Sequence, residues 1–367
     1  MKKITAIALS GGIDSLFAAY LLKQQGHHVI GTHFITGFES KVSRHPNNRS
    51  IKDSDTAGFL ENQDSHSLKI ANIANQLGIT VKILDIRTDF KLKIVDYFTR
   101  TYLAGKTPNP CLVCNPSIKF GTLLTYARKL GASRLATGHY ARISADSTGR
   151  FHLLRGIDKK KDQSYFLAFM TQKQLARACF PLGKMTKSDV KKLAKEKGLR
   201  PEIKKESQDI CFIDGNKYGD FLLQQQNFKA NPGDIVDTKG HILGRHHGLH
   251  LFTVGQRRGI NCPALQPYYV VQIDTNKNRL IVGIKKDLLS SSCRVNKINW
   301  IIEKPSSPLD VDIRVRYRHK AVRSRLIPDG STSATIIFET PQSAVTPGQG
   351  AVFYKGNEVI GGGWIDA

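Results

Sequence analysis

A glycine-rich turn near the start of the chain constrains the fold more than any other feature. The apolar run at residues 4–9 is typical of a short, fully buried strand of a parallel sheet. Residues 15–25 have the apolar spacing of an amphipathic helix, and Gly26 ends it. The turn between them, residues 10–15, reads Ser-Gly-Gly-Ile-Asp-Ser. A strand, a glycine turn and a helix in this order predict an α/β domain.

The same turn has the chemistry of an anion-binding loop. Gly11 and Gly12 allow a tight turn and a close approach of the backbone to a ligand, since neither carries a Cβ. The helix that follows directs its unpaired N–H groups and the positive end of its dipole at the loop. Ser10 and Ser15 add hydroxyl donors, whereas the lysine of a Walker loop is missing, so transfer of a γ-phosphoryl group is not expected. The alternative is a plain glycine turn whose serines only cap the helix.

The first half of the chain alternates strand and helix patterns. Strands are predicted at residues 29–34, 79–86 and 134–137, and helices at 67–77, 118–130 and 189–197. Ser188 is the predicted N-cap of the last helix. The polar residues 36–64 predict a long loop. Alternating units of this kind predict a doubly wound, mostly parallel sheet.

The second half changes character beyond about residue 213. Glycine and proline become frequent there, as in Pro232-Gly233 and Pro347-Gly348. Short β-rich runs lie between these breaks, at residues 268–273, 279–283, 311–317, 335–338 and 351–354. This spacing predicts small β modules or a barrel.

The charge of the chain predicts its partners. Lys and Arg number 55 against 30 Asp and Glu, a formal net charge of +25. Such an excess attracts polyanions, so nucleic acid and an anionic membrane surface are the candidates. No apolar run approaches the roughly 18 residues of a spanning helix, and we find no lipidation motif or signal-peptide cleavage site. We therefore expect a cytoplasmic protein that binds nucleic acid and no membrane, with reduced thiols.

One run of cations suggests where nucleic acid binds. If residues 311–320 form one strand, the even-numbered side chains share a face, because successive side chains alternate across a strand. That face carries four cations, Arg314, Arg316, Arg318 and Lys320. The opposite face carries Val311, Ile313, Val315 and Tyr317. The pattern predicts a stripe that follows phosphate groups, and an ordinary solvated strand face is the alternative.

Three of the six cysteines have patterned surroundings. Cys111 and Cys114 have Cys-x-x-Cys spacing beside two prolines, and Cys211 lies far along the chain. Reactive thiols need a lowered pKa, which the nearby Lys119, Lys204 and Lys205 would provide. A structural zinc site is not expected, because no second pair of ligands completes the first. The remaining cysteines are assigned to the core or to packed loops: Cys179, Cys262 and Cys293.

These motifs, taken in order, resemble the tRNA-specific 2-thiouridylase family of the ATP-pyrophosphatase superfamily, across nearly the full chain. The matching segments are residues 10–15, 107–120, 136–140, 161–167, 211–212, 254–259, 315–318 and 345–349. The resemblance implies three parts: an ATP-pyrophosphatase catalytic domain with a doubly wound, mostly parallel sheet (1–213), a small central β-rich domain (214–283) and a C-terminal β-barrel that contacts tRNA (284–367).

The resemblance also implies an activity. Family members use ATP to replace the 2-oxygen of the wobble uridine, position 34 of certain tRNAs, by sulfur. They adenylate the uracil oxygen and release pyrophosphate, which requires Mg²⁺. The target base must leave its stack to reach a buried pocket. The alternatives are another RNA-modifying or amidating enzyme with the same loop, and a non-catalytic RNA-binding protein.

Individual positions follow from the matched motifs. The resemblance implies that ATP is bound by Ala8, Leu9, Ser10, Gly11, Gly12, Ile13, Asp14, Ser15, Phe34 and Gly138. It implies that tRNA is bound by Asn109, Pro110, His139, Lys161, Asp162, Gln163, Arg316, Tyr317 and Gln349. The catalytic residues would be Cys111, Cys114 and Cys211.

The chain departs from many family members at Cys111, where they carry Asp, and at residues 207–209, where they carry Ser-Thr-Gly. The Cys111 version resembles a sub-type for which a [4Fe–4S] cluster is proposed, and three thiolates would leave one iron open for sulfide. In the other mechanism Cys211 carries a persulfide and Cys114 resolves it; the resemblance includes a disulfide bond. The third thiol favours the cluster. The sulfur comes from a donor protein, either a cysteine desulfurase or a sulfur relay, or from free sulfide.

Overall fold

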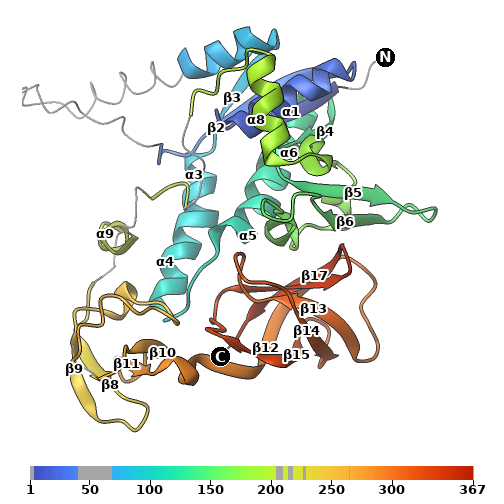
Figure 1. Ribbon diagram of the computed structural model, residues 1–367. Helices are drawn as coiled ribbons and strands as arrows, with labels where there is room; N and C mark the ends of the chain where they lie inside the picture. The colour runs from blue at the N-terminus through green and yellow to red at the C-terminus, as the bar shows by residue number, and fades with distance from the viewer. Residues whose placement is uncertain are drawn as a thin grey trace, which may run out of the picture.

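The N-terminal part of the molecule is built on a parallel sheet. The computed structural model describes residues 4–39, 68–203, 210–213, 218–225, 229–263 and 265–366 (Figure 1). The sheet has the order β3-β2-β1-β4-β7, with every pair parallel. Its strands are β1 (Ile4–Ala8), β2 (His28–Ile35), β3 (Val81–Asp85), β4 (Ala132–Ala136) and β7 (Ala178–Cys179). The predicted doubly wound sheet is confirmed, whereas residues 40–64 of the predicted long loop lie outside the described residues.

The N-terminal part also contains helices. They are α1 (Ile13–Gln24), a helix over residues 68–77, α3 (Arg87–Phe90), η1 (Lys91–Val95), α4 (Asp96–Leu103), α5 (Pro110–Cys114), η2 (Asn115–Leu123), α6 (Leu124–Lys129), α7 (Gln172–Leu175) and α8 (Lys187–Glu196). Short 3₁₀ turns are η3 (Ser164–Leu167) and η4 (Pro181–Lys184). One hydrophobic cluster joins α1 to α8, with Leu16 and Leu22 of α1 packed in the same core as Val190.

The predicted N-cap of α8 is wrong by two residues. Thr186 caps the helix, because its backbone is extended and its hydroxyl accepts a hydrogen bond from Asp189 N at 3.2 Å. The Asp189 carboxylate accepts one from Thr186 N in return, which completes a capping box. Ser188 lies inside the first turn, so Thr186 and not Ser188 satisfies the free N–H of Asp189.

The second half forms two β structures. The central module has a sheet of order β10-β11-β8-β9, and a short helix precedes it. Its elements are α9 (Tyr218–Leu223), β8 (Gly233–Val236), β9 (Ile242–His246), η5 (Leu249–Leu251), β10 (Tyr269–Asp274), β11 (Arg279–Gly283) and η6 (Lys285–Leu288). It lies at the lower end of α4 (Figure 1), where the rings of Tyr102 and Tyr218 stack with centroids 5.2 Å apart.

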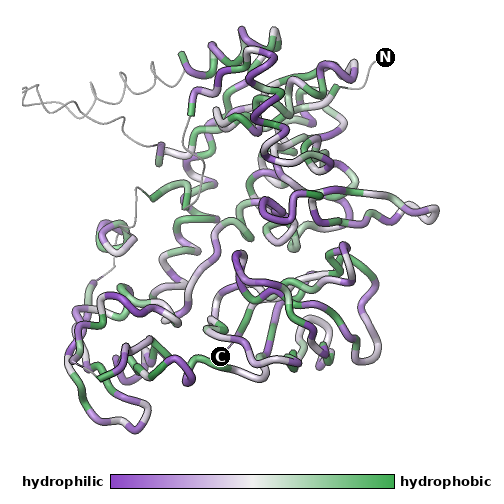
Figure 2. Tube along the Cα trace, in the orientation of Figure 1, coloured by the Kyte–Doolittle hydropathy of each residue, from purple (hydrophilic) through white to green (hydrophobic). Residues whose placement is uncertain are grey.

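The C-terminal part is a closed antiparallel barrel, as predicted. Its order is β12-β15-β14-β13-β16-β17, and β12 closes it by pairing with β17. The strands are β12 (Leu289–Trp300), β13 (Leu309–Arg314), β14 (Val322–Pro328), β15 (Ala334–Ser343), β16 (Gly350–Lys355) and β17 (Glu358–Ile365). Hydrophobic and hydrophilic residues alternate along several of these strands (Figure 2), so one face of each packs into a core.

The predicted stripe of four cations does not form. Strand β13 ends at Arg314, and residues 315–320 turn away from the sheet. The side chain of Arg314 is 15% exposed and faces inward, where its Nη1 lies 3.2 Å from Asp162 Oδ2. The apolar half of the pattern is correct, since Val311, Ile313 and Val315 are buried. The inward pairing of Arg314 and the end of the strand break the cationic face.

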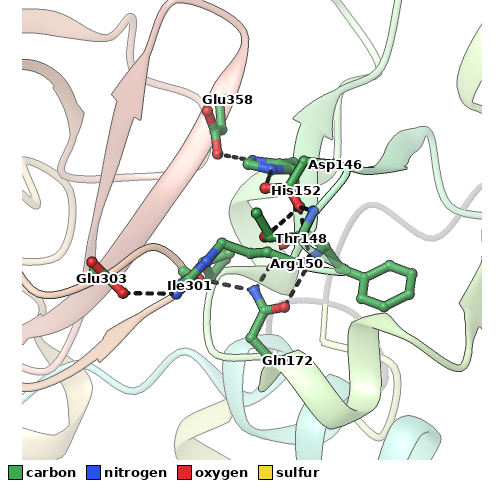
Figure 3. Close-up of polar contacts among 9 residues, drawn as sticks. Asp146, Thr148, Arg150, His152, Gln172, Ile301, Glu303 and Glu358 are labelled. Atoms are coloured by element: carbon green, nitrogen blue, oxygen red, sulfur yellow. Dashed lines mark hydrogen bonds and ion pairs between the residues drawn. The ribbon is translucent and has the colours of Figure 1, made fainter.

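A hairpin of the N-terminal part extends the barrel sheet. It consists of β5 (Ala141–Ala145) and β6 (Phe151–Arg155), and β6 pairs with β17. His152 of the hairpin lies between two carboxylates (Figure 3), with Glu358 Oε1 2.6 Å from Nδ1 and Asp146 Oδ2 3.0 Å from Nε2. Beside it Arg150 contacts Glu303 of the barrel side at 3.4 Å. These contacts fix the N-terminal part to the barrel. Within the described ranges, no helix combines the length and apolar character that a membrane crossing needs.

The carboxylates around His152 make this contact dependent on pH. Hydrogen bonds with Glu358 and then Asp146 raise the pKa of His152, so the contact stabilises the fold below the unfolded pKa of about 6.5. That stabilisation is lost as pH rises through the folded value, and it also falls in acid, once the carboxylates protonate. We expect His152→Gln to lower the free energy of unfolding by about 0.5–1 kcal/mol at pH 5.5. At pH 8.5 the loss should be much smaller.

Urea unfolding at both pH values measures this effect. His28→Gln is the matched control, because His28 is exposed at the start of β2. A loss of stability in His152→Gln that is the same at both pH values would contradict the prediction.

Candidate active site

The turn after β1 is shaped to receive an anion. Gly11 has φ +84°, a conformation that favours glycine. The Ser15 hydroxyl donates to Gly12 O at 3.0 Å and accepts from Ser10 N at 3.2 Å, so it holds the turn closed. Helix α1 begins after Gly12 without a side-chain cap. The first N–H groups of α1 therefore face the loop without a capping side chain, as an anion site requires.

This loop lies at the topological switch point of the sheet, where the strand order reverses between β1 and β4. Strand β1 has β2 on one side and β4 on the other, so the loops that follow β1 and β4 open a crevice between them. Gly138 follows β4, and a Cβ there would lie 2.8 Å from Asp14 C and 2.9 Å from Ser15 N. Only glycine permits this approach. Phe34, half-buried at the end of β2, and the Ala8–Leu9 backbone complete the group of positions expected to bind nucleotide.

A lysine from a distant helix supplies the cation that the loop lacks. Lys187 Nζ, at the start of α8, lies 2.7 Å from both carboxylate oxygens of Asp14, and its side chain is 9% exposed. Tyr140 donates its hydroxyl to Asp14 Oδ1 at 2.8 Å. Sequence reasoning missed both partners, since Lys187 is 173 residues away from Asp14 and lies in a lysine-rich segment.

The fold brings the three predicted cysteines together. Cys111 and Cys114 lie one turn apart on α5, whose first residue is Pro110. Cys211 is close enough to influence the pKa of both electrostatically. Cys114 packs in the hydrophobic cluster that contains Phe212, the neighbour of Cys211. Residues 204–209, which include Lys204, Lys205 and the departure at 207–209, lie outside the described residues.

Lys119 does not give the three thiols the low pKa values that were expected. Burial raises the pKa of Cys111 to about 11 and that of Cys114 to about 12. Desolvation also raises the pKa of Cys211, although its side chain is the most exposed of the three. The Lys119 ammonium lowers all three, but desolvation outweighs it. At neutral pH the three are therefore thiols, and their activation requires a change of surroundings at the site.

The three thiols are the residues predicted to ligate a [4Fe–4S] cluster. Among the described residues, which include all six cysteines, no set of three His, Cys, Asp or Glu side chains is arranged to hold a metal ion. Ligation of a [4Fe–4S] cluster by Cys111, Cys114 and Cys211 stays a prediction. All six cysteines are free thiols. The disulfide bond implied by the resemblance is not present in the structure.

Lys119 also links the cysteines to the nucleotide loop. Its Nζ lies 3.4 Å from Nε2 of His139, which is 8% exposed. Because an ammonium only donates, Nε2 accepts, and Nδ1 carries the proton that it shares with Thr137 Oγ1 at 2.6 Å. Burial, assisted by Lys119, holds the pKa of His139 well below its usual range, so the ring is neutral.

Some positions expected to bind tRNA hold the barrel against the cysteine loop. Gln349 donates to Thr107 O at 3.1 Å and to Pro108 O at 3.0 Å, and Asn109 donates to Gln349 Oε1 at 3.4 Å. Pro110 is buried at the start of α5. The barrel therefore orients the segment that carries Cys111 and Cys114.

The other expected tRNA positions lie between the hairpin and the barrel. Asp162 is buried, whereas Lys161 and Gln163 beside it are half-buried. Burial lowers the pKa of Arg316, and the ring of Tyr317 lies 4.3 Å from that of Phe166. These residues are contiguous with the cysteine site, because Phe166 O accepts a hydrogen bond from Asn115 beside Cys114.

Three family models match the chain in succession. Residues 2–215 match the "tRNA methyl transferase HUP domain". Residues 219–284 match the "tRNA methyl transferase PRC-barrel domain", and residues 290–365 match the "Aminomethyltransferase beta-barrel domain". The matches agree with the predicted order of an α/β domain, a small β-rich domain and a barrel.

Curated relatives cover the whole chain. The protein named "tRNA-specific 2-thiouridylase MnmA" from Desulfosudis oleivorans is 49% identical over 99% of this chain and 95% of its own length. The proteins of that name from Geobacter metallireducens and Nostoc punctiforme are 44% and 42% identical over 100% of this chain. They are covered over 97% and 99% of their lengths, respectively.

Proposed function

The chain belongs to the tRNA-specific 2-thiouridylase family, as the sequence motifs predicted, and from that premise we propose that it uses ATP to thiolate the wobble uridine of tRNA. The observation that carries the proposal is that one residue, Lys119, connects the nucleotide loop with the three cysteines. Lys119 contacts His139 beside the nucleotide loop and acts electrostatically on all three thiols. We infer that an ATP-activating loop and a sulfur-carrying group act on the same bound base.

Methyl transfer, which two of the family-model descriptions mention, fits these residues less well. It needs neither a loop for the triphosphate nor a group of cysteines. Sulfur insertion needs both, because the uracil oxygen must become a leaving group before sulfur attacks. The glycine loop with Lys187 and Asp14 supports the first requirement. The three neighbouring thiols support the second.

Activation is assigned to the loop. The backbone N–H groups after Gly12 and the Lys187 ammonium bind the phosphates of ATP, and Phe34 and Gly138 border the nucleotide. The uracil 2-oxygen attacks the α-phosphorus, and pyrophosphate leaves. The Asp14 side chain is 35% exposed, so its carboxylate fits a Mg²⁺ ion that arrives with the phosphates and neutralises their charge.

Sulfur transfer is assigned to the cysteines. Cys211 is the most exposed of the three and receives sulfur as a persulfide. Its terminal sulfur attacks C2 of the adenylated uracil, and AMP leaves with the former 2-oxygen. The Cys114 thiolate then attacks Sγ of Cys211, which releases 2-thiouridine and forms a Cys114–Cys211 disulfide. A thiol reductant must restore the pair before the next cycle.

The partners follow from this chemistry. The net charge of +25 supports tRNA binding, and the positions proposed for it are Asn109, Pro110, His139, Lys161, Asp162, Gln163, Arg316, Tyr317 and Gln349. Persulfide formation at Cys211 requires a sulfur donor protein or free sulfide with an oxidant. We place the reaction in the cytoplasm, where tRNA and ATP meet.

The test is a reconstituted reaction with purified protein, ATP, Mg²⁺, a persulfide-carrying donor and unmodified tRNA. We expect pyrophosphate and 2-thiouridine to form only when ATP and tRNA are both present. A tRNA whose wobble base is cytidine is the matched control, and it should give neither product. Tight tRNA binding without release of pyrophosphate would instead favour a non-catalytic RNA-binding protein.

A further inference from the structure

A continuous series of hydrogen bonds joins the barrel to the nucleotide loop. It begins at Arg314 on the barrel strand β13, whose Nη1 lies 3.2 Å from Asp162 Oδ2. Both side chains are largely buried, at 15% and 4% exposure. Arg314 also donates through Nε to His319 O at 3.1 Å, so its guanidinium is fixed from the barrel side. A buried, charged contact of this kind has a defined geometry, because either partner alone would be costly to desolvate.

Asp162 orders the segment that follows it. Its other carboxylate oxygen accepts hydrogen bonds from Gly156 N at 3.2 Å and Ser164 N at 3.1 Å. The hydrogen bonds and the ion pair that the structure gives for the Asp162 carboxylate are therefore all made with groups of the protein itself. The effect is to hold Gln163, the residue between Asp162 and Ser164, in one orientation.

Gln163 in turn holds Tyr140 by two bonds. Gln163 N donates to Tyr140 O at 2.9 Å, and Tyr140 N donates to Gln163 Oε1 at 3.0 Å. Gly156 lies against the same carbonyl, since a Cβ there would come within 2.7 Å of Tyr140 O. The Tyr140 backbone therefore has little room to move.

Tyr140 completes the series at the loop. Its ring is 2% exposed, and its hydroxyl donates to Asp14 Oδ1 at 2.8 Å. Lys187 approaches the same carboxylate from α8. Asp14 is thus held from two sides, by a neutral donor connected to the barrel and by a cation connected to the catalytic domain.

We propose that Tyr140 is a positioning residue for Asp14 and that Gln163, Asp162 and Arg314 anchor it to the barrel. This inference rests on the proposed function, in which Asp14 acts on MgATP. It gives Asp162 an internal task, namely to fix the barrel side of the nucleotide site. The barrel then contributes to ATP binding through Arg314 and Asp162.

The direct test is Tyr140→Phe, which removes only the hydroxyl. Loss of a hydrogen bond to a charged group is expected to weaken binding of a non-hydrolysable MgATP analogue about 10- to 100-fold, measured by calorimetry without tRNA. The affinity for tRNA should be unchanged. Tyr165→Phe is the matched control, since Tyr165 is fully buried and its hydroxyl donates to Gly350 O at 2.8 Å. It should lower Tm similarly without changing nucleotide affinity. Unchanged nucleotide affinity in folded Tyr140→Phe would overturn the proposal.

A double-mutant cycle tests the connection to the barrel. Asp162→Asn alone should weaken nucleotide binding about 2- to 10-fold, but less than 2-fold in the Tyr140→Phe background, because both act through one hydroxyl. Additive effects would show that Asp162 does not act through Tyr140. If Asp162→Asn does not fold, Gln163→Ala breaks the next bond in the series and has the same expected outcomes. Because the readout is binding, it remains valid even if the wild-type protein transfers no sulfur.

Discussion

Asp14→Ala should reduce tRNA-dependent release of pyrophosphate at least about 100-fold, the usual cost of removing one group that stabilises charge in a transition state. Asp14 holds the buried Lys187 ammonium at 2.7 Å, so its removal also leaves that cation misplaced. Lys187→Met should cause a loss of the same size. The measurement is the initial rate of pyrophosphate release at saturating tRNA.

Two comparisons make this result specific. Lys192→Met changes an exposed lysine on the same helix and should leave the rate unchanged. The affinity of Asp14→Ala for tRNA should stay near that of the wild-type protein, because Asp14 is not among the positions proposed to bind tRNA. A wild-type rate in either Asp14→Ala or Lys187→Met would show that this loop does not bind the phosphates of ATP.

Cys211→Ser should reduce 2-thiouridine formation below detection while pyrophosphate release persists. A hydroxyl cannot carry a persulfide, but the nucleotide loop is unaffected by the change. Cys114→Ser should stop after at most one transfer step. The disulfide that joins Cys211 to the sulfur on the uracil is then no longer resolved. Cys293→Ser changes a partly buried thiol that packs against the barrel core; it is the matched control and should retain both reactions. Thiouridine formation by Cys211→Ser at the wild-type rate would exclude this residue as the carrier.

Cys111 separates the two sulfur-transfer mechanisms. In the persulfide route that we propose, Cys111→Ser keeps most of the activity, because this thiol neither carries nor resolves the persulfide. If three thiolates instead assembled a cluster during the reaction, the same variant would lose both activity and bound iron. Iron and sulfide analysis of protein purified without oxygen, before and after tRNA addition, distinguishes these outcomes.

The fold was predictable wherever the pattern was local. The strand, glycine turn and helix at residues 4–25 are decided by neighbouring residues, and β11 lies where the apolar run predicted it, at Arg279–Gly283. The prediction of one long strand after Val311 was wrong beyond Arg314, because the length of a strand depends on tertiary contacts. Arg314 turns toward the buried Asp162, and the strand ends there. The hairpin β5–β6 joins the barrel sheet through pairing that no local pattern encodes.

The candidate site was predictable in its motifs but not in its connections. The resemblance implied that Gly138 binds ATP, and the structure brings Gly138 against the loop that contains Asp14. Lys187 and Tyr140 have no sequence signal that links them to Asp14, from which they are 173 and 126 residues away. The prediction of low thiol pKa values failed for another reason. The pKa values are set mainly by burial, which depends on the packing around α5 and not on the neighbouring lysines.

Following the oxygen atom that sulfur replaces tests the central claim most directly. A substrate tRNA is prepared with ¹⁸O at the 2-position of its wobble uracil, and the products of a single turnover are examined by mass spectrometry. If the uracil oxygen is adenylated, the label must appear in the phosphate group of AMP, in equal amount to the 2-thiouridine formed. Label in water or in pyrophosphate, with AMP unlabelled, would contradict activation of the uracil by ATP at this loop.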